Sequence, residues 1–296
     1  MQPDQLCGAL KGAFRGQDGF TPPDGINKAA TNLRHMDLGL DRSLAAAYQS
    51  KAQVARVVTE DWVGRELYCP SCTSDSLTRS LTGRAVVDFS CDSCSETFQL
   101  KSRSKPFRSR VLDSAYGPMI ESVAKSQAPS FLFLQYSCSE WRVREVFLVP
   151  HFFMSPSAIE KRRPLRASAQ RAGWIGCNIL LDALPVDARI AVVRDGRPRL
   201  PEQVRDAWRM FSFMRGAAPE SRGWMADVLA CVRELGEQEF SLTEMYAFEG
   251  RLRHMHRDNR NIRPKIRQQL QVLRDHGALE FLGRGRYRVL LVPQIA

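Results

Sequence analysis

The sequence predicts an α/β protein with a mixed sheet, followed by a smaller domain of three helices and two strands. Three observations predict this: a helical apolar period over residues 38–62, short strand-like runs after it, and a change of composition near residue 218. A helix followed by mixed strands is typical of α/β domains. With 296 residues, the chain is long enough for two domains with separate cores.

We expect three parts. Residues 1–35 carry scattered Gly and Pro without an apolar period, which predicts a flexible leader that is dispensable and ends before Met36. Residues 36–218 form the larger domain, and residues 219–296 form the smaller one. In the larger domain we expect strands over residues 84–90, 97–102, 130–136, 144–149 and 190–193, a helix near 114–124 and a basic helical connector within 197–219.

Bulk composition narrows the class of protein. Hydrophobic residues make up 44% and charged residues 25%, as in soluble globular proteins. No apolar run approaches a membrane span and the first thirty residues lack a signal peptide, so we expect a cytoplasmic protein. We also expect it to be a monomer. The net charge of +11 favours a polyanionic partner, and charge alone leaves DNA, RNA and an anionic membrane surface open.

Four of the eight cysteines form two C-x-x-C pairs. Cys69 and Cys72 make the first pair, and Cys91 and Cys94 make the second after eighteen intervening residues. This spacing predicts a zinc ribbon, in which four thiolates surround zinc (Zn²⁺) and leave no position for water, so the zinc would be structural. We expect ordinary core or surface positions for the remaining cysteines, Cys7, Cys138, Cys177 and Cys231.

A carboxylate, an amide and a lysine flank the second cysteine pair. Asp88 ends one strand-like run, and Gln99 and Lys101 share one face of the next because side chains alternate along a strand. The hairpin turn is at residues 91–94, so zinc would fix the relative position of the two strands. This set suits phosphodiester hydrolysis: Asp88 and Gln99 would bind magnesium (Mg²⁺), and Lys101 would orient or deprotonate the attacking water.

The spacing D-x10-Q-x-K resembles the PD-(D/E)xK nuclease motif, with Gln99 where an acid usually stands. A neutral amide binds magnesium more weakly than a carboxylate, although some Mrr-like nucleases carry Q-x-K. Glu60 and Glu66, on the helix before the first cysteine pair, could add a metal ligand. Taken without their context, Asp88, Gln99 and Lys101 would indicate only a solvated sheet face.

The C-terminal residues predict a winged helix-turn-helix domain. We expect helices over residues 221–235, 243–256 and 262–275, and strands over 279–282 and 287–291 around a turn at 283–285. Between residues 251 and 288, eleven Lys or Arg stand against three Asp or Glu, which favours duplex DNA over a merely solvated basic helix.

The third helix and the wing carry the candidate DNA contacts. An apolar stripe of Ile262, Ile266, Leu270 and Leu273 leaves the polar side chains of this helix facing outward. Glutamine can bond the N6 and N7 edge of adenine, and arginine reaches phosphate or guanine. The candidate DNA-binding residues are Arg263, Lys265, Arg267, Gln268, Gln271, Arg274, Arg284 and Arg286.

Residues 36–290 resemble the DpnI-like methyl-directed restriction endonucleases, which combine a PD-(D/E)xK domain with a winged helix. The resemblance lies in residues 59–62, 68–102, 171–179, 221–224 and 265–275. It implies magnesium-dependent cleavage of duplex DNA at GATC sites with N6-methylated adenine, the methyl group being read by both domains. It also implies that Trp174 meets the methylated adenines, whereas Trp174 by itself would indicate loop packing. Gln99 is the catalytic residue that departs from the family.

Two other functions share these features. A non-catalytic reader of methylated DNA or a transcription factor would need the same zinc ribbon and winged helix, but not a metal-binding strand face. A repair or Mrr-like nuclease would differ in its preferred site. Cleavage of methylated against unmethylated DNA in the presence of magnesium separates the three functions.

Overall fold

The structure is a computed structural model that describes residues 36–80 and 87–290. The predicted flexible leader, Cys7 and the first part of the strand expected over residues 84–90 lie outside the described residues. None of the helices in the described ranges has the length and apolar character needed to cross a membrane.

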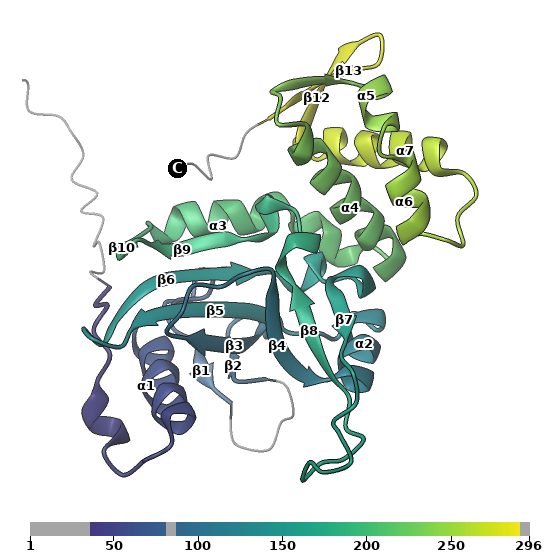
Figure 1. Cartoon of the computed structure of the whole chain (residues 1–296). Coiled ribbons are helices and arrows are strands. Elements are labelled where there is room, and N and C mark those ends of the chain that lie inside the picture. Colours follow the sequence, from purple (N-terminus) through teal and green to yellow (C-terminus); the bar gives the residue numbers. More distant parts are fainter. Residues whose placement is uncertain (1–35, 81–86, 291–296) are drawn as a thin grey trace, which may run out of the picture. The chain divides into compact units, whose positions relative to one another are not determined.

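The largest sheet in the described part of the chain has seven strands in the order β1-β2-β3-β5-β6-β9-β10 (Figure 1). Neighbouring strands are antiparallel except β3 and β5, which are parallel, so the predicted mixed sheet is confirmed. The strands are β1 (Thr78–Arg79), β2 (Phe89–Ser90), β3 (Thr97–Arg103), β5 (Ser130–Ser137), β6 (Arg142–Val149), β9 (Ile190–Arg194) and β10 (Arg197–Pro198).

A second, three-stranded sheet was not predicted. It has the order β4-β8-β7 and consists of β4 (Arg110–Ala115), β7 (Ile159–Lys161) and β8 (Gly176–Leu180), all antiparallel. These strands are short, and β4 includes Asp113 and Ser114, whose residue types disfavour strands, so only pairing between distant segments creates the sheet. The register of β4 against β8 shifts between Leu112 and Ala115, which makes a β-bulge at Asp113 and Ser114.

Two helices cover opposite faces of the seven-stranded sheet (Figure 1). Helix α1 (Lys51–Glu66) packs beside β3, and α3 (Pro201–Met210) packs on the other face, where Trp208 meets Phe98 with ring centroids 6.3 Å apart. Helix α2 (Tyr116–Ala124) packs against the second sheet. The short 3-10 helices are η1 (Arg42–Ala45), η2 (His151–Phe153), η3 (Pro156–Ala158), η4 (Leu181–Ala183), η5 (Val186–Ala188) and η6 (Ser212–Gly216).

The first helix is shorter than predicted. The periodicity predicted one helix over residues 38–62, but residues 42–45 form the separate turn η1 and α1 begins at Lys51. The Asp41 carboxylate accepts a hydrogen bond from Ser43 N at 2.9 Å. This bond caps η1 at Asp41, whose backbone is extended, and the backbone is extended again at Ser50 before α1 begins. The apolar period alone therefore overestimated the length.

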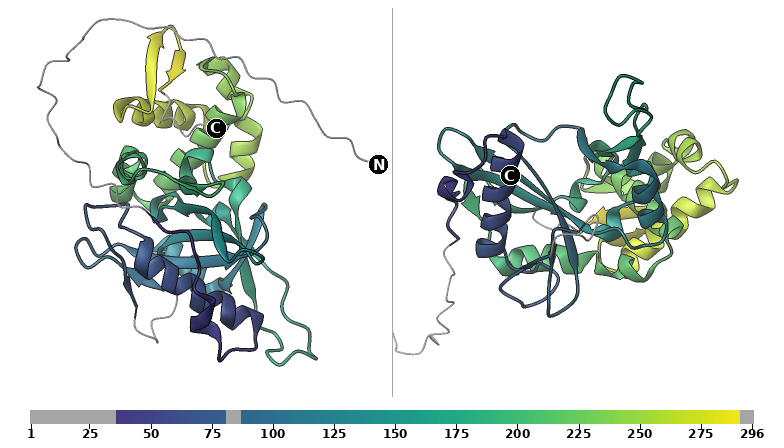
Figure 2. Two further views of the ribbon diagram at one scale, coloured as in Figure 1. Left: turned by 90° about the vertical axis from the view of Figure 1, so that its left-hand side faces the viewer. Right: turned by 90° about the horizontal axis from the view of Figure 1, so that it is seen from below.

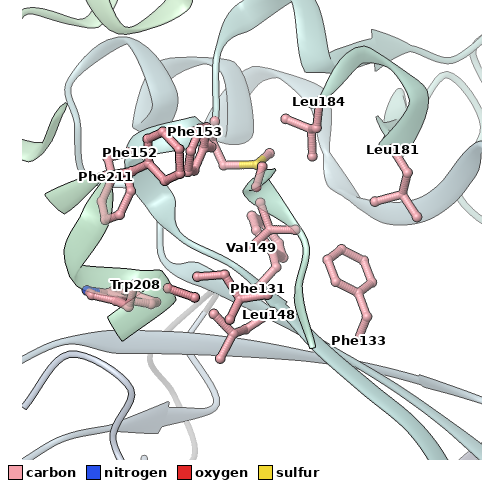
Figure 3. Packing of buried hydrophobic residues seen from close by; sticks show 14 of the residues in the cluster. Phe131, Phe133, Leu148, Val149, Phe152, Phe153, Leu181, Leu184, Trp208 and Phe211 are labelled. Carbon is pink, nitrogen blue, oxygen red and sulfur yellow. The ribbon is translucent and has the colours of Figure 1, made fainter. Parts of the chain in front are cut away.

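Aromatic residues of η2 pack against α3 and the residue that follows it (Figure 3). Phe152 contacts Trp208 at a centroid distance of 5.6 Å, and Phe153 contacts Phe211 at 5.3 Å. Phe131, on the strand beside β3, is fully buried. Burial of each such side chain contributes about 1.5–3 kcal/mol relative to its exposure. The strand that carries Gln99 and Lys101 joins this layer through the contact of Phe98 with Trp208.

The C-terminal residues form the predicted winged helix-turn-helix domain (Figure 2). Its elements are α4 (Pro219–Leu235), β11 (Glu239–Ser241), α5 (Leu242–Tyr246), α6 (Glu249–Met255), α7 (Ile262–Asp275), β12 (Leu279–Gly283) and β13 (Arg286–Val289). The single helix predicted over residues 243–256 is two short helices, α5 and α6. The turn at residues 283–285 is confirmed, since all three residues have positive φ.

Candidate active site and DNA-binding surfaces

The four cysteines of the two C-x-x-C pairs converge as predicted. Their sulfur atoms lie within 4.8 Å of one another, with 3.6 Å between the Sγ atoms of Cys69 and Cys94 and between those of Cys72 and Cys91. At Cys91 burial acts to raise the pKa, but hydrogen bonds from backbone N–H groups, that of Cys94 first, outweigh it and lower the pKa to about 7. Four thiol ligands at this spacing fit a tetrahedral structural zinc.

Hydrogen bonds connect the cysteine cluster to the rest of the domain. Arg205 of α3 donates from Nε to the carbonyl of Cys69 at 3.2 Å. Arg215 donates to Ser71 Oγ at 3.1 Å and to the buried carboxylate of Glu96 at 2.8 Å. The cluster also closes the hairpin of β2 and β3, where Phe89 pairs with Phe98. It therefore sets the start of β3.

Asp88, Gln99 and Lys101 line one groove of about 710 Å³ between α1, β3 and β4. The structure therefore brings the three candidate catalytic residues together. Asp88 lies just before β2, and its Oδ2 accepts a hydrogen bond from Leu100 N at 2.8 Å. This bond aligns the carboxylate with the β3 backbone between Gln99 and Lys101.

The Gln99 side chain is buried and its carbonyl oxygen is unsatisfied. Oε1 has no hydrogen-bond partner within residues 36–80 and 87–290. Leaving a buried carbonyl unpaired costs about 1–3 kcal/mol, so such an atom usually has a partner, which can be a water molecule or an ion. An amide oxygen beside a carboxylate fits a hard divalent cation such as magnesium.

Of the two glutamates considered as further ligands, only Glu60 lies in the groove. Its side chain is 6% exposed and forms ion pairs with Arg56, at 2.7 Å, and with Arg79 of β1. Glu66 is directed elsewhere, because its Oε2 accepts from the backbone N–H of Asp37 at 3.1 Å. The groove thus contains a second carboxylate, whose charge two arginines already balance.

The Lys101 ammonium forms an ion pair with Asp113, a residue that was not among the predicted site residues. Asp113 belongs to the second sheet, and no local pattern connects it with β3. The thiol of Cys177, on β8, lies 3.9 Å from Asp113 Oδ2. Burial, and then the negative charge of Asp113, raise the pKa of this thiol to about 12, so Cys177 is a neutral neighbour of the carboxylate.

Trp174 lies in the connection from β7 to β8, outside the groove that contains Asp88. Its side chain is half-buried and its ring lies close to Gly176 and to the Arg162 guanidinium. The same connection carries further arginines at positions 163, 166 and 171 and no acidic residue. An aromatic ring on a strongly basic loop is a surface suited to DNA.

Helix α7 has the predicted apolar stripe, with Ile262, Ile266, Leu270 and Leu273 all buried. Of the candidate DNA contacts, six are exposed and two, Lys265 and Arg274, are half-buried. Some already contact their own domain: Arg263 pairs with Glu249 at 2.7 Å, and Arg286 pairs with Glu239 at 3.2 Å. The exposed residues are Arg263, Arg267, Gln268, Gln271, Arg284 and Arg286.

Two family models match the chain. The DpnI model, described as the Dam-replacing family, matches residues 36–217, which is more than half of the sequence. The chain belongs to the DpnI family. A second model, the Dam-replacing HTH domain of DpnI, matches residues 220–289. The resemblance found in the sequence is confirmed, and DpnI family membership indicates a restriction endonuclease that acts on DNA.

Proposed function

We propose that this member of the DpnI family is a methyl-directed endonuclease that uses magnesium to cut duplex DNA at GATC sites with N6-methyladenine. One observation carries the catalytic part of the proposal. Gln99, whose buried Oε1 has no hydrogen-bond partner among the described residues, lines the same groove as Asp88 and Lys101, so the groove has oxygen donors for a cation beside an ammonium. Those are the parts that phosphodiester hydrolysis needs.

In this proposal Asp88 and Gln99 hold the magnesium ion, which would supply Lewis-acid stabilisation of the phosphate charge and a more acidic bound water. Leu100 N keeps the Asp88 carboxylate in place by its hydrogen bond to Oδ2. Lys101 donates to the attacking water or to a phosphate oxygen. Arg56 and Arg110, which are both more than half exposed at the groove, position the DNA backbone.

The two domains divide the recognition of DNA. We propose residues 36–218 as the nuclease domain, in which Trp174 contacts the N-methyl group of adenine with its indole ring. Residues 219–296 act as the second reader through α7 and the wing, with Gln268 and Gln271 directed to base edges and the arginines to phosphates. We further propose that the protein works as a cytoplasmic monomer and that residues 1–35 are dispensable for cleavage.

The rival function, a methyl-DNA reader without activity, is favoured by one observation. Gln99 supplies no charge where the family carries an acid, so the groove has one carboxylate fewer for magnesium. A reader would bind methylated DNA and leave it intact. The two functions therefore differ in one measurable property, the cleavage of methylated DNA.

Digestion of plasmid DNA tests the proposal. The protein is incubated with plasmid from a host that methylates GATC and from a host that does not, with magnesium or with EDTA. We expect discrete fragments only from methylated plasmid with magnesium. Binding of methylated DNA without cleavage at any magnesium concentration would instead establish the reader.

A further inference from the structure

We infer that Asp113 is a positioning residue for DNA cleavage, because its buried carboxylate holds the Lys101 ammonium at the wall of the catalytic groove. The inference rests on the proposed function and adds a residue outside the D-x10-Q-x-K motif. It is based on an ion pair, a β-bulge and the burial of both partners.

The burial of the two partners is unequal. The Asp113 side chain is 0% exposed, whereas that of Lys101 is 16% exposed and lines the groove. Asp113 Oδ1 accepts from Lys101 Nζ. The Asp113 carboxylate therefore lies in the protein interior, and the Lys101 ammonium lies at the surface of the groove, where it can contact DNA.

The β-bulge in β4 places Asp113 at this point. Residue 111, Val111, is buried and residue 112, Leu112, is 64% exposed, so alternation along the strand turns Asp113 inward. The bulge then occupies Asp113 and Ser114, and the strand resumes its pairing with β8 at Ala115. Bulges commonly redirect a side chain beside an active site.

A second strand also contacts Asp113. Cys177 of β8 lies 3.9 Å from Asp113 Oδ2 and donates to the Ser114 carbonyl at 3.3 Å. Ser114 Oγ approaches Oδ2 at 3.5 Å. The carboxylate is therefore held by its own strand and its neighbour, while Lys101 provides the opposite charge from the other sheet.

The ion pair with Asp113 restricts the Lys101 side chain and leaves part of its ammonium available to DNA. An ammonium has three N–H donors, and one is directed to Asp113, which leaves two for water and phosphate oxygens. A long lysine side chain has many rotamers, and a fixed carboxylate at its end selects among them. Since a displacement of about 1 Å in a reacting group costs about 100-fold in rate, the selection matters for the chemical step.

The test compares two isosteric substitutions, Asp113→Asn and Asp187→Asn. Asp187 pairs with Arg233, and the side-chain exposures of this pair, 4% and 17%, match the 0% and 16% of Asp113 and Lys101. Asp187 lies outside the groove, so its variant measures the general effect of breaking a buried ion pair. The full chain is assayed for single-turnover cleavage of methylated plasmid, for DNA affinity without metal and for melting temperature.

We expect Asp113→Asn to lower the single-turnover cleavage rate by about 100-fold while the metal-free DNA affinity stays within about twofold. Asp187→Asn should lower the melting temperature about as much as Asp113→Asn does, but it should cleave DNA at the rate of the unaltered chain. Asp113→Glu, which retains the charge one methylene further out, should recover part of the cleavage rate. If Asp113→Asn folds poorly, the cleavage rate of Asp113→Glu is compared with those of the unaltered chain and Asp187→Asn instead.

Three results would overturn the inference. Cleavage by Asp113→Asn at the rate of the unaltered chain would show that Lys101 needs no such partner. A loss of rate matched by Asp187→Asn, or accompanied by loss of DNA binding, would show general damage. If the unaltered chain itself failed to cleave, the proposed function would fall together with the inference, whereas the first two results leave that function standing.

Discussion

The indole ring of Trp174 lies where a side chain at position 176 would stand. A Cβ added to Gly176 would come within 2.7 Å of Cζ3 and Cη2 of this ring, and within 3.2 Å of Arg162 Nη1. Gly176 does not have a positive φ, so alanine is acceptable to the backbone, and the conflict is with two side chains: the indole ring first and the Arg162 guanidinium second. The ring position therefore depends on a residue with no side chain.

This contact predicts that Gly176→Ala displaces the indole without removing it. If Trp174 reads the methyl group, the ratio of cleavage of methylated to unmethylated plasmid should fall about tenfold, the effect of one lost specific contact of about 1.4 kcal/mol. Gly117→Ala is the control, because an added Cβ there meets no described atom within 4 Å. An unchanged ratio for Gly176→Ala, with normal folding, would remove Trp174 from the recognition of methylated adenine.

Asp88→Ala should abolish cleavage, with a loss on the order of 10³-fold or more, since the groove loses its charged ligand for magnesium. Metal-free binding of methylated DNA should stay almost unchanged, because affinity comes mainly from phosphate and base contacts elsewhere. Gel shifts in EDTA and single-turnover nicking assays measure the two properties. Normal nicking by this variant would place the active site elsewhere.

Gln99→Glu should retain or improve cleavage at low magnesium, because it restores a charged ligand. We expect the magnesium concentration for half-maximal rate to fall by about tenfold, as is typical when groups around a bound metal change. Without metal the same variant should melt at a lower temperature than the unaltered chain, because it adds a second buried carboxylate near Asp88. Magnesium should raise its melting temperature more than that of the unaltered chain. Complete loss of activity would mean that this chain depends on the amide.

Natively purified protein should contain about one zinc per chain, held through mild chelation that already stops cleavage. The apparent binding free energy of a structural zinc, about 10–16 kcal/mol, is as large as the stability of a whole domain. Cys94→Ser should therefore lose the metal and most of the cooperative melting of residues 36–218. Elemental analysis without zinc, or an unchanged melting curve for this variant, would contradict the structural role.

Local patterns determined much of this protein. The two C-x-x-C pairs predicted the cysteine cluster, alternation along β3 placed Gln99 and Lys101 on one face, and the spacing of Ile262, Ile266 and Leu270 predicted the buried side of α7. Each of these signals spans few residues and depends only on the repeat of a strand or helix or on ligand spacing. The structure agrees with these predictions for that reason.

Tertiary structure alone decided the rest. The second sheet, the choice of Glu60 over Glu66, the Asp113–Lys101 pair and the place of the Trp174 ring beside Gly176 all arise from contacts between segments that are distant in the chain or bent by a bulge. Such contacts depend on which strands pair and in which register, and a shift of one residue would turn Asp113 away from Lys101. No periodicity in the sequence predicts which strands pair or in which register.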